Sequence, residues 1–214
     1  MDFMSAPMLA LFAGSSLRLA MPMLLGSMGE LVSERAGVLN LSVEGMMLMG
    51  AFAGAMGSLA TGSATLGLVL ALVAVLPVAL LQAFLRITLR ANQIVTGIGI
   101  NILVLGGTTM AYRELLGHRS RVQIPGLDRW APPGLGDIPV FGAALFNQTW
   151  LLYAALAIVV AIAWVMRYTA LGLAIHAAGA EPRALDKSGG SVTRVRYGAV
   201  VFTGLMSALG GAFL

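Results

Sequence analysis

The chain has 214 residues, of which 58% are hydrophobic and only 10% are charged. A soluble domain carries about 25% charged residues, so the composition indicates a membrane protein. The absence of cysteine excludes disulfides, thiolate metal sites and a cysteine nucleophile. The 13 basic residues are scattered among loops without a basic run, so they are interpreted as topology signals and no nucleic-acid partner is expected.

The first apolar stretch, residues 4–32, is interrupted by Arg18 and allows two interpretations. One is a single tilted span, with approximate bounds 8–32. The other is a short interfacial helix followed by a span from residue 19, which Arg18 and Pro22 together favour because proline kinks a membrane helix. The start of the sequence lacks the positive region of a signal peptide, so the mature chain is expected to begin near Met1.

A polar segment then lies between two strongly apolar flanks, in GELVSERAGVLNLSVEGMMLMG (residues 29–50). Charge near hydrocarbon is costly and normally lines a pathway or an interface, although a solvated turn would also accommodate it. Glu44 opens directly into an apolar run, 45–61, which is short for a span. A short span after a polar, glycine-containing segment indicates a helix broken inside the membrane, beside a substrate path. Helix capping by Asn40 or Ser42 is the alternative.

Two further spans follow, 64–85 and 94–112, separated by the loop RITLRANQ. Asn92, Gln93 and Asn101 lie near the start of the second of them. Asn92 and Asn101 are nine residues apart and fall on opposite faces of a regular helix, whereas Gln93 and Asn101 are about 80° apart. Asn101 is therefore a candidate for the lumen, with an interhelical hydrogen bond as the alternative.

The second half contains a long polar connection, 113–147, a span at 148–166, a second polar segment at 167–197 and a final apolar stretch at 198–214. Because the sequence stops inside that apolar stretch, we expect it to be a truncated piece of a longer chain. The loops 86–93 and 167–197 are expected on the same side of the membrane, opposite the loop 113–147. Together they hold seven basic residues, whereas 113–147 holds four. The positive-inside rule therefore places them in the cytoplasm and predicts that 113–147 is periplasmic.

No phosphate-binding loop or hydrolase motif occurs, so any energy input must come from another chain or an ion gradient. The fold predicted from the residues is all-α, a polytopic transmembrane helical bundle with a broken membrane helix near the N-terminus. The segment 172–196 reads as short amphipathic helices broken by glycine and proline, which could fit a groove on a soluble partner or lie solvated without one.

Three motifs in order carry a resemblance: SERAGVLNLSVEGMMLMGAFAG, RANQIVTGIGIN and GLAIHAAGAEPRALDKSGGSVTRVRY. Together they resemble bacterial ABC importer permeases of the branched-chain amino acid and simple-sugar type, and within that group the nucleoside or purine branch. The resemblance covers residues 15–214. The sequence departs from the family in its length, and in Gly190, which stands where an apolar residue is common and is expected to loosen the segment.

The resemblance implies a multi-pass protein of the bacterial inner membrane that works with a second permease subunit, an ATP-binding subunit and an extracytoplasmic solute-binding protein. ATP and Mg would be bound by the ATPase, and this chain would be a transport subunit with no catalytic residue, metal or cofactor of its own. The residues implied to contact the ATPase are Gly179, Glu181, Pro182, Ala184, Asp186 and Gly189. Those implied to lie near the translocation path are Asn40, Glu44, Asn92, Gln93 and Asn101.

Three functions remain at this stage. The first is an ABC importer permease, for nucleosides or alternatively for simple sugars or branched-chain amino acids. The second is an ion-coupled secondary carrier, for which Glu44 is the candidate proton or sodium site. The third is a membrane scaffold that transports nothing.

Overall fold

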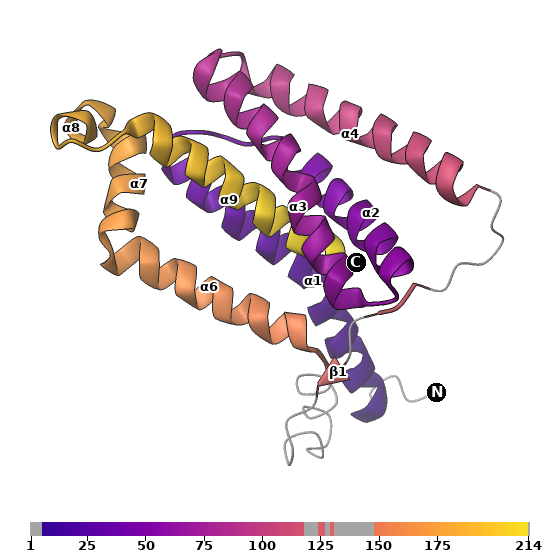
Figure 1. Ribbon diagram of the computed structural model, residues 1–214. Helices are drawn as coiled ribbons and strands as arrows, with labels where there is room; N and C mark the ends of the chain where they lie inside the picture. Colours follow the sequence, from indigo (N-terminus) through magenta and orange to yellow (C-terminus); the bar gives the residue numbers. More distant parts are fainter. Residues whose placement is uncertain (1–5, 118–123, 127–128, 131–147, 214) are drawn as a thin grey trace.

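The computed structural model describes residues 6–117, 124–126, 129–130 and 148–213, and shows a bundle of helices (Figure 1). Five helices within this part of the chain are long and apolar enough to cross a membrane, which confirms the predicted polytopic bundle. The elements are α1 (Ala6–Arg35), α2 (Val43–Thr61), α3 (Ala64–Ala83), the π-helix η1 (Phe84–Thr88), α4 (Gln93–Leu116), the strands β1 (Arg129–Trp130) and β2 (Gln148–Thr149), which pair antiparallel, α6 (Trp150–Tyr168), α7 (Ala170–Ala180), α8 (Pro182–Lys187) and α9 (Val192–Phe213).

Helix α9 forms the centre of the bundle, although it comes last in the chain. It packs against α1, α2 and α3, and Figure 1 shows it running between them. Its buried face consists largely of small residues, among them Gly204, Ser207, Ala208, Gly210 and Gly211. A Cβ atom on Gly50 of α2 would lie only 2.5 Å from the Cα atom of Ala208. The two backbones therefore touch, as expected where membrane helices associate through small residues.

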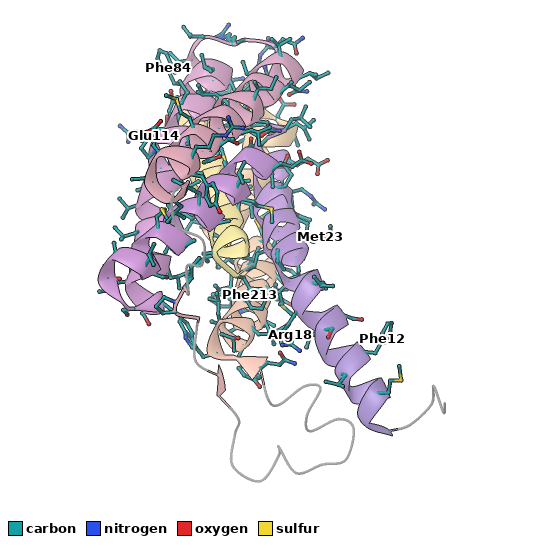
Figure 2. All side chains as sticks on the ribbon, turned by 90° about the vertical axis from the view of Figure 1, so that its right-hand side faces the viewer. Phe12, Arg18, Met23, Phe84, Glu114 and Phe213 are labelled. Carbon is teal, nitrogen blue, oxygen red and sulfur yellow. The ribbon has the colours of Figure 1, made fainter. Side chains whose placement is uncertain are left out.

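Helix α1 is continuous, so the favoured interpretation of a break near Arg18 is wrong. The helix passes through both Arg18 and Pro22, and the Arg18 Nε atom donates to the Gly14 carbonyl at 3.2 Å. This bond gives the guanidinium a partner within its own helix, which removes one reason for the chain to break. Figure 2 shows the exposed side chains of Phe12 and Met23 on the outer edge of α1, away from the other helices.

The helical path is interrupted between α1 and α2, by residues 36–42. Four of these residues, Ala36, Val38, Asn40 and Ser42, are almost completely buried. The first turn of α2 is hydrogen-bonded to Asn101, eight residues after the first residue of α4. At 1.5 Å per residue, α2 therefore begins about 12 Å along α4. The second helix starts inside the bundle, as the polar segment before the short span predicted.

Several boundaries lie beyond those predicted from hydropathy. Helix α4 ends at Leu116 and includes the first residues of the predicted loop 113–147, most of which lies outside the described residues. The predicted loop 86–93 is helical up to Thr88, and most of 167–197 is also helical, with α9 starting at Val192. These differences share one cause, because polar helical turns that extend beyond the hydrocarbon carry no hydropathy signal.

The segments 86–93 and 167–197 meet at one end of the bundle. The hydroxyl groups of Thr88 and Tyr197 are 2.5 Å apart, so η1 contacts the first turns of α9. This is the arrangement that the assignment of both segments to one side of the membrane requires. Their cytoplasmic location stays a prediction.

The close contact of α2 with α9 predicts the effect of adding one methyl group. Gly50→Ala should lower the free energy of unfolding by about 1–3 kcal/mol, because the new Cβ atom meets the backbone of Ala208 and α9 must shift. Gly99→Ala is the matched control, since nothing lies within 4 Å of a Cβ atom there. Thermal unfolding in detergent, followed by circular dichroism, measures both. Equal stability of the two variants would contradict the contact.

Candidate functional site

The break before α2 is held by a cluster of buried polar groups. The Asn40 amide donates to Glu30 Oε1 at 2.7 Å, which ties the break to α1. The Asn40 side-chain oxygen accepts from both the amide and the hydroxyl of Ser42, at 3.1 and 2.6 Å. A side-chain oxygen that bonds two residues ahead forms an Asx turn, which starts a helix. Asn40 therefore positions Ser42, the residue at the N-cap of α2, and its side chain is buried. The capping alternative is not confirmed, because α2 has no side-chain hydrogen bond to its cap in the described structure.

Asn101 joins α4 to the same break. Its side-chain oxygen accepts from the Gly45 amide at 2.8 Å, and its nitrogen donates to the Leu41 carbonyl at 3.0 Å. The amides in the first turn of a helix have no partner within that helix, and carbonyls beside a break are left without one in the same way. One carboxamide thus satisfies a donor and an acceptor of the break. This is the interhelical bond considered as the alternative to a lumen-facing role.

Glu44 is exposed, unlike Asn40 and Asn101 at the same break. It lies in the first turn of α2, where the partial positive charge of the helix terminus favours a carboxylate. Among the described residues it forms no hydrogen bond or ion pair through its side chain. Of the five predicted path residues, Glu44 alone therefore presents an uncommitted polar group at the level of the break.

The other two candidates stabilise the start of α4. The exposed Asn92 is its N-cap, accepting from the amides of Ile94 and Val95. Gln93 accepts from Arg86 Nη2 at 2.9 Å, which links α4 to η1. The structure thus brings Asn40, Glu44 and Asn101 together around the first turn of α2. It places Asn92 and Gln93 at the N-terminus of α4. Their predicted role in a translocation path stays a prediction.

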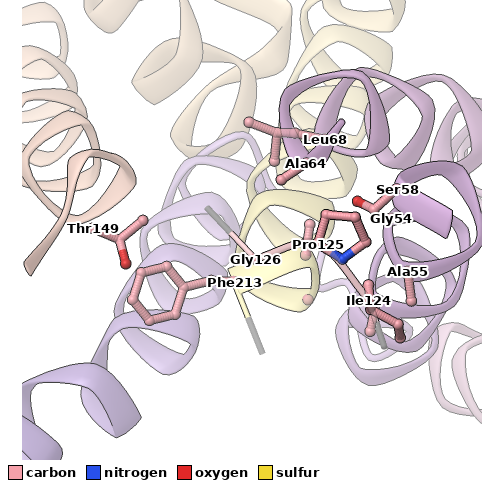
Figure 3. Close-up of a pocket in the computed structure, with 13 residues that line it drawn as sticks. Gly54, Ala55, Ser58, Ala64, Leu68, Ile124, Pro125, Gly126, Thr149 and Phe213 are labelled. Carbon is pink, nitrogen blue, oxygen red and sulfur yellow. The ribbon is translucent and has the colours of Figure 1, made fainter. Parts of the chain in front are cut away.

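A cavity of about 320 Å³ lies at the opposite end of the bundle (Figure 3). Its walls come from α2, α3 and the last turn of α9, with Ile124, Pro125 and Gly126 closing one side. Most of the lining residues are small or apolar, and Ser58 and Thr149 provide the hydroxyl groups. Among the described residues, the lining includes no charged side chain, so this part of the cavity offers little for recognising a polar solute.

The helical segment α7–α8 projects from the bundle (Figure 1). Helix α8 begins with Pro182, a residue suited to the first helical position, and only Leu185 of its six residues is buried. Glu181, Ala184 and Asp186 are exposed, whereas Pro182 is half-buried. Gly179 lies at the base of the projection, where a Cβ atom would overlap the Arg35 carbonyl oxygen. The predicted contact residues therefore form an exposed surface above a tightly packed base.

Arg196 fixes that base to the bundle. Its Nε atom donates to the Ala36 carbonyl at 3.1 Å, and Nη2 donates to the Ala178 carbonyl at 2.9 Å. One guanidinium group thereby connects α9, the break after α1 and the end of α7. Because its fork is planar and rigid, this side chain holds the end of α7 next to the break.

A second contact joins α1 to α7. Arg35 Nη1 and His176 Nε2 are 3.0 Å apart, and His176 Nδ1 lies 2.8 Å from the Gly172 carbonyl. A carbonyl can only accept, so Nδ1 is the donor, and Nε2 of the neutral ring accepts from the guanidinium. Arg35, at the end of α1, therefore contacts α7 twice: its side chain meets His176 and its carbonyl oxygen lies against Gly179.

The turn after α8 is closed rather than loosened. Gly189 has a φ of +86°, which favours glycine, and the Gly190 amide donates to the Leu185 carbonyl at 3.0 Å. A Cβ atom on Gly190 would lie 2.5 Å from Leu185 Cδ1, so this glycine allows the turn to close over the buried leucine. The expectation that Gly190 loosens the segment is contradicted by this packing.

Sequence reasoning did not identify Glu30, Arg196 or His176 as site residues. Glu30 lies in the charged segment 29–50 that the sequence analysis singled out, but it was not chosen as a site residue, because no sequence pattern marks the Asn40 amide as its partner. Arg196 was counted only as a topology signal. Its partners are backbone carbonyls 18 and 160 residues away in the chain, and no sequence pattern marks such acceptors.

Comparison with known proteins gives the family. Residues 12–214 match the family described as branched-chain amino acid transport system / permease component. The chain belongs to this family. The match extends over the break, the start of α4 and the α7–α8 segment, so all three motifs that carried the resemblance lie within it.

Three curated relatives are similar along most of the chain. The guanosine ABC transporter permease protein NupQ of Bacillus subtilis is 35% identical over 95% of this chain and 66% of its own length. The nucleoside ABC transporter permease protein NupC of Lactococcus lactis is 34% identical over 89% and 62%. TsgC13 of Haloferax volcanii, provisionally named as a glucose ABC transporter permease, is 36% identical over 94% and 61%. The chain thus spans less than two thirds of their length. No solved structure matches it significantly.

The bridge formed by Asn101 predicts a loss of stability when it is removed. Asn101→Leu keeps a similar volume but leaves the Gly45 amide and the Leu41 carbonyl without their partner, so the free energy of unfolding should fall by about 1–2 kcal/mol. Asn92→Ser is the control, because serine also caps helices. Thermal unfolding in detergent compares the two, and an unchanged Asn101→Leu protein would exclude the bridge.

The role of Arg196 predicts a local change in dynamics. Arg196→Met removes the bonds to Ala36 and Ala178, so amide hydrogen exchange in residues 170–187 should become about tenfold faster, as one lost charge-assisted bond implies. Arg194→Met, two residues away, is the control because the described structure gives its guanidinium no hydrogen bond. Similar exchange in both variants would show that Arg196 does not hold α7.

Proposed function

We propose that this chain is a permease subunit of an ATP-driven ABC importer and forms part of the translocation path for a small polar solute. A nucleoside is the first candidate, because two of the three similar relatives are named for guanosine or nucleosides. A simple sugar is the second candidate, from the relative named for glucose, and a branched-chain amino acid the third, from the family description. Family membership, with the motifs in the expected order, is the observation that carries the proposal.

Energy would enter through the α7–α8 segment. Helix α8 exposes Glu181, Ala184 and Asp186, so an ATP-binding subunit could receive it in a groove. Arg196 and the Arg35–His176 contact connect this surface to the end of α1 and to the break. Closure of two ATPases would then move a stiff element instead of a loose loop. ATP and Mg would bind to the ATPase, and this chain would not be an enzyme.

The solute would pass the break at the start of α2. Glu44 is exposed there and uncommitted, so it could accept hydrogen bonds from a ribose or a base, while Asn40 and Asn101 keep the backbone in place. The path would be completed by a second permease subunit, and an extracytoplasmic binding protein would deliver the solute. Such an assembly lies in the bacterial inner membrane. A ligand drives the change of access only through different affinities for the two states.

Co-purification from the native membrane, combined with uptake of labelled guanosine, tests this function. The intact protein should bring down an ATP-binding subunit, and Glu181→Arg should abolish that recovery by placing a cation on the exposed docking surface. Arg113→Ala, at the far end of α4, is the control and should retain the ATPase. Uptake should depend on ATP and persist without a proton gradient.

The same experiment separates the alternatives. Uptake that depends on the proton gradient, and that Glu44→Gln abolishes without loss of ATPase recovery, would favour the ion-coupled carrier. Recovery of the protein without any ATPase, and without uptake, would favour a scaffold. Competition by unlabelled glucose or leucine, in place of nucleosides, would reassign the solute.

A further inference from the structure

A polar cavity of about 420 Å³ lies where the break, η1 and the start of α9 meet. Its volume is within the range of small-molecule sites, about 300–1,000 Å³. The charged lining residues are three arginines, Arg86, Arg90 and Arg196, and one acid, Asp186. The proposed transport function assigns no ligand to this space, although Asp186 also belongs to the exposed surface of α8 and Arg196 also fixes the base of that projection.

The positive charge of this cavity is not neutralised within the described part of the chain. Arg86 donates to the Ala91 carbonyl and to Gln93 Oε1, and Arg196 donates to two backbone carbonyls, so all four acceptors are uncharged. A guanidinium group has five N–H donors. Arg86 and Arg196 each use two of them, so each keeps three for a ligand. Asp186 accepts from the Val192 amide at 3.5 Å and forms no salt bridge with the described residues. Three cations and one anion leave a net positive cavity.

The backbone around the cavity is held in unusual geometry. Arg90 has a φ of +51°, and is the one described residue other than glycine with a positive φ. Arg90 lies two residues after the last residue of the π-helix η1. Short π-helical turns are common at functional sites. A non-glycine residue in the left-handed region is destabilising by about 1–3 kcal/mol, and such positions cluster where a ligand is held. The guanidinium of Arg90 is exposed and has no partner among the described residues.

We propose that this cavity binds a phosphate group. Planar guanidinium groups recognise phosphate oxygens through paired, charge-assisted hydrogen bonds, and three of them at one cavity provide the donors. Arg86 and Arg196 are already fixed by their carbonyl partners, so little side-chain freedom is lost when the anion binds. Either a small soluble phosphate or the headgroup of an anionic phospholipid supplies this chemistry. The bound anion would join Arg90 and η1 to Arg196, and so stabilise the contact with the break.

Arg90→Gly is the variant that tests the site without endangering the fold. Glycine adopts a positive φ freely, so the variant removes the guanidinium and the backbone strain together and should fold at least as well as the parent. Arg113→Ala is the control for loss of one arginine, because it lies near the other end of α4 and outside the cavity.

The measurement is thermal unfolding of the full chain in nanodiscs of zwitterionic lipid, followed by tryptophan fluorescence. Inorganic phosphate should raise the melting temperature of the parent and of Arg113→Ala above that in chloride of equal ionic strength. The apparent affinity of Arg90→Gly for phosphate should be about tenfold weaker, as loss of one charge-assisted contact implies. A second series replaces part of the lipid with an anionic phospholipid, without added phosphate.

The two series identify the source of the phosphate. An effect of free phosphate alone indicates a soluble ligand, and an effect of anionic lipid that Arg90→Gly abolishes indicates a headgroup. Equal responses of the parent and Arg90→Gly in both series would overturn the proposal. Absence of any response, with loss of ATPase co-purification in Arg90→Gly, would also overturn it and assign the arginines to the protein interface. Neither result depends on whether the protein transports nucleosides.

Discussion

Buried backbone groups that leave a helix must find other hydrogen-bond partners, and this constraint determines the region around residues 36–42. The chain meets it with side chains drawn from distant elements. Glu30 accepts a hydrogen bond from the Asn40 amide, and Arg196 donates to the Ala36 carbonyl. Asn101 accepts from the Gly45 amide and donates to the Leu41 carbonyl. Helix α2 can begin inside the bundle because these partners replace the hydrogen bonds that a continuous helix would have provided.

The same groups connect the two ends of the proposed mechanism. Arg196 holds the first residue of the break on one side and the end of α7 on the other, so the α7–α8 projection shares a fixed point with the end of α1. Stiffness is what a lever requires, and the closed turn at Gly190 adds to it. The polar residues of the break can therefore have a structural role while the break itself takes part in the proposed mechanism.

The sequence predicted the helical class, the membrane location and the order of the polar segments, because hydropathy and helix-breaking residues are local signals. It was less informative on single side chains. Asn40 and Asn101 were placed beside a path, yet Asn40 accepts from the Ser42 amide and Asn101 bonds the Gly45 amide and the Leu41 carbonyl. The Asn101 bonds depend on the register between α2 and α4. The continuity of α1 through Pro22 was missed for a related reason. Packing along the rest of a long helix outweighs the loss of one hydrogen bond, and packing partners are not visible in one sequence.

The central position of α9 has a consequence for how the protein is made. Thr203 donates to the Gly29 carbonyl, and the small face of α9 fills the space between α1, α2 and α3. These early helices leave the ribosome long before α9, because the two bonded partners are 174 positions apart in the chain. Until then they must remain in the bilayer with glycine-lined surfaces turned toward lipid or toward one another. Helix α9 therefore has to insert between helices that were made earlier, and that step is where misassembly would arise.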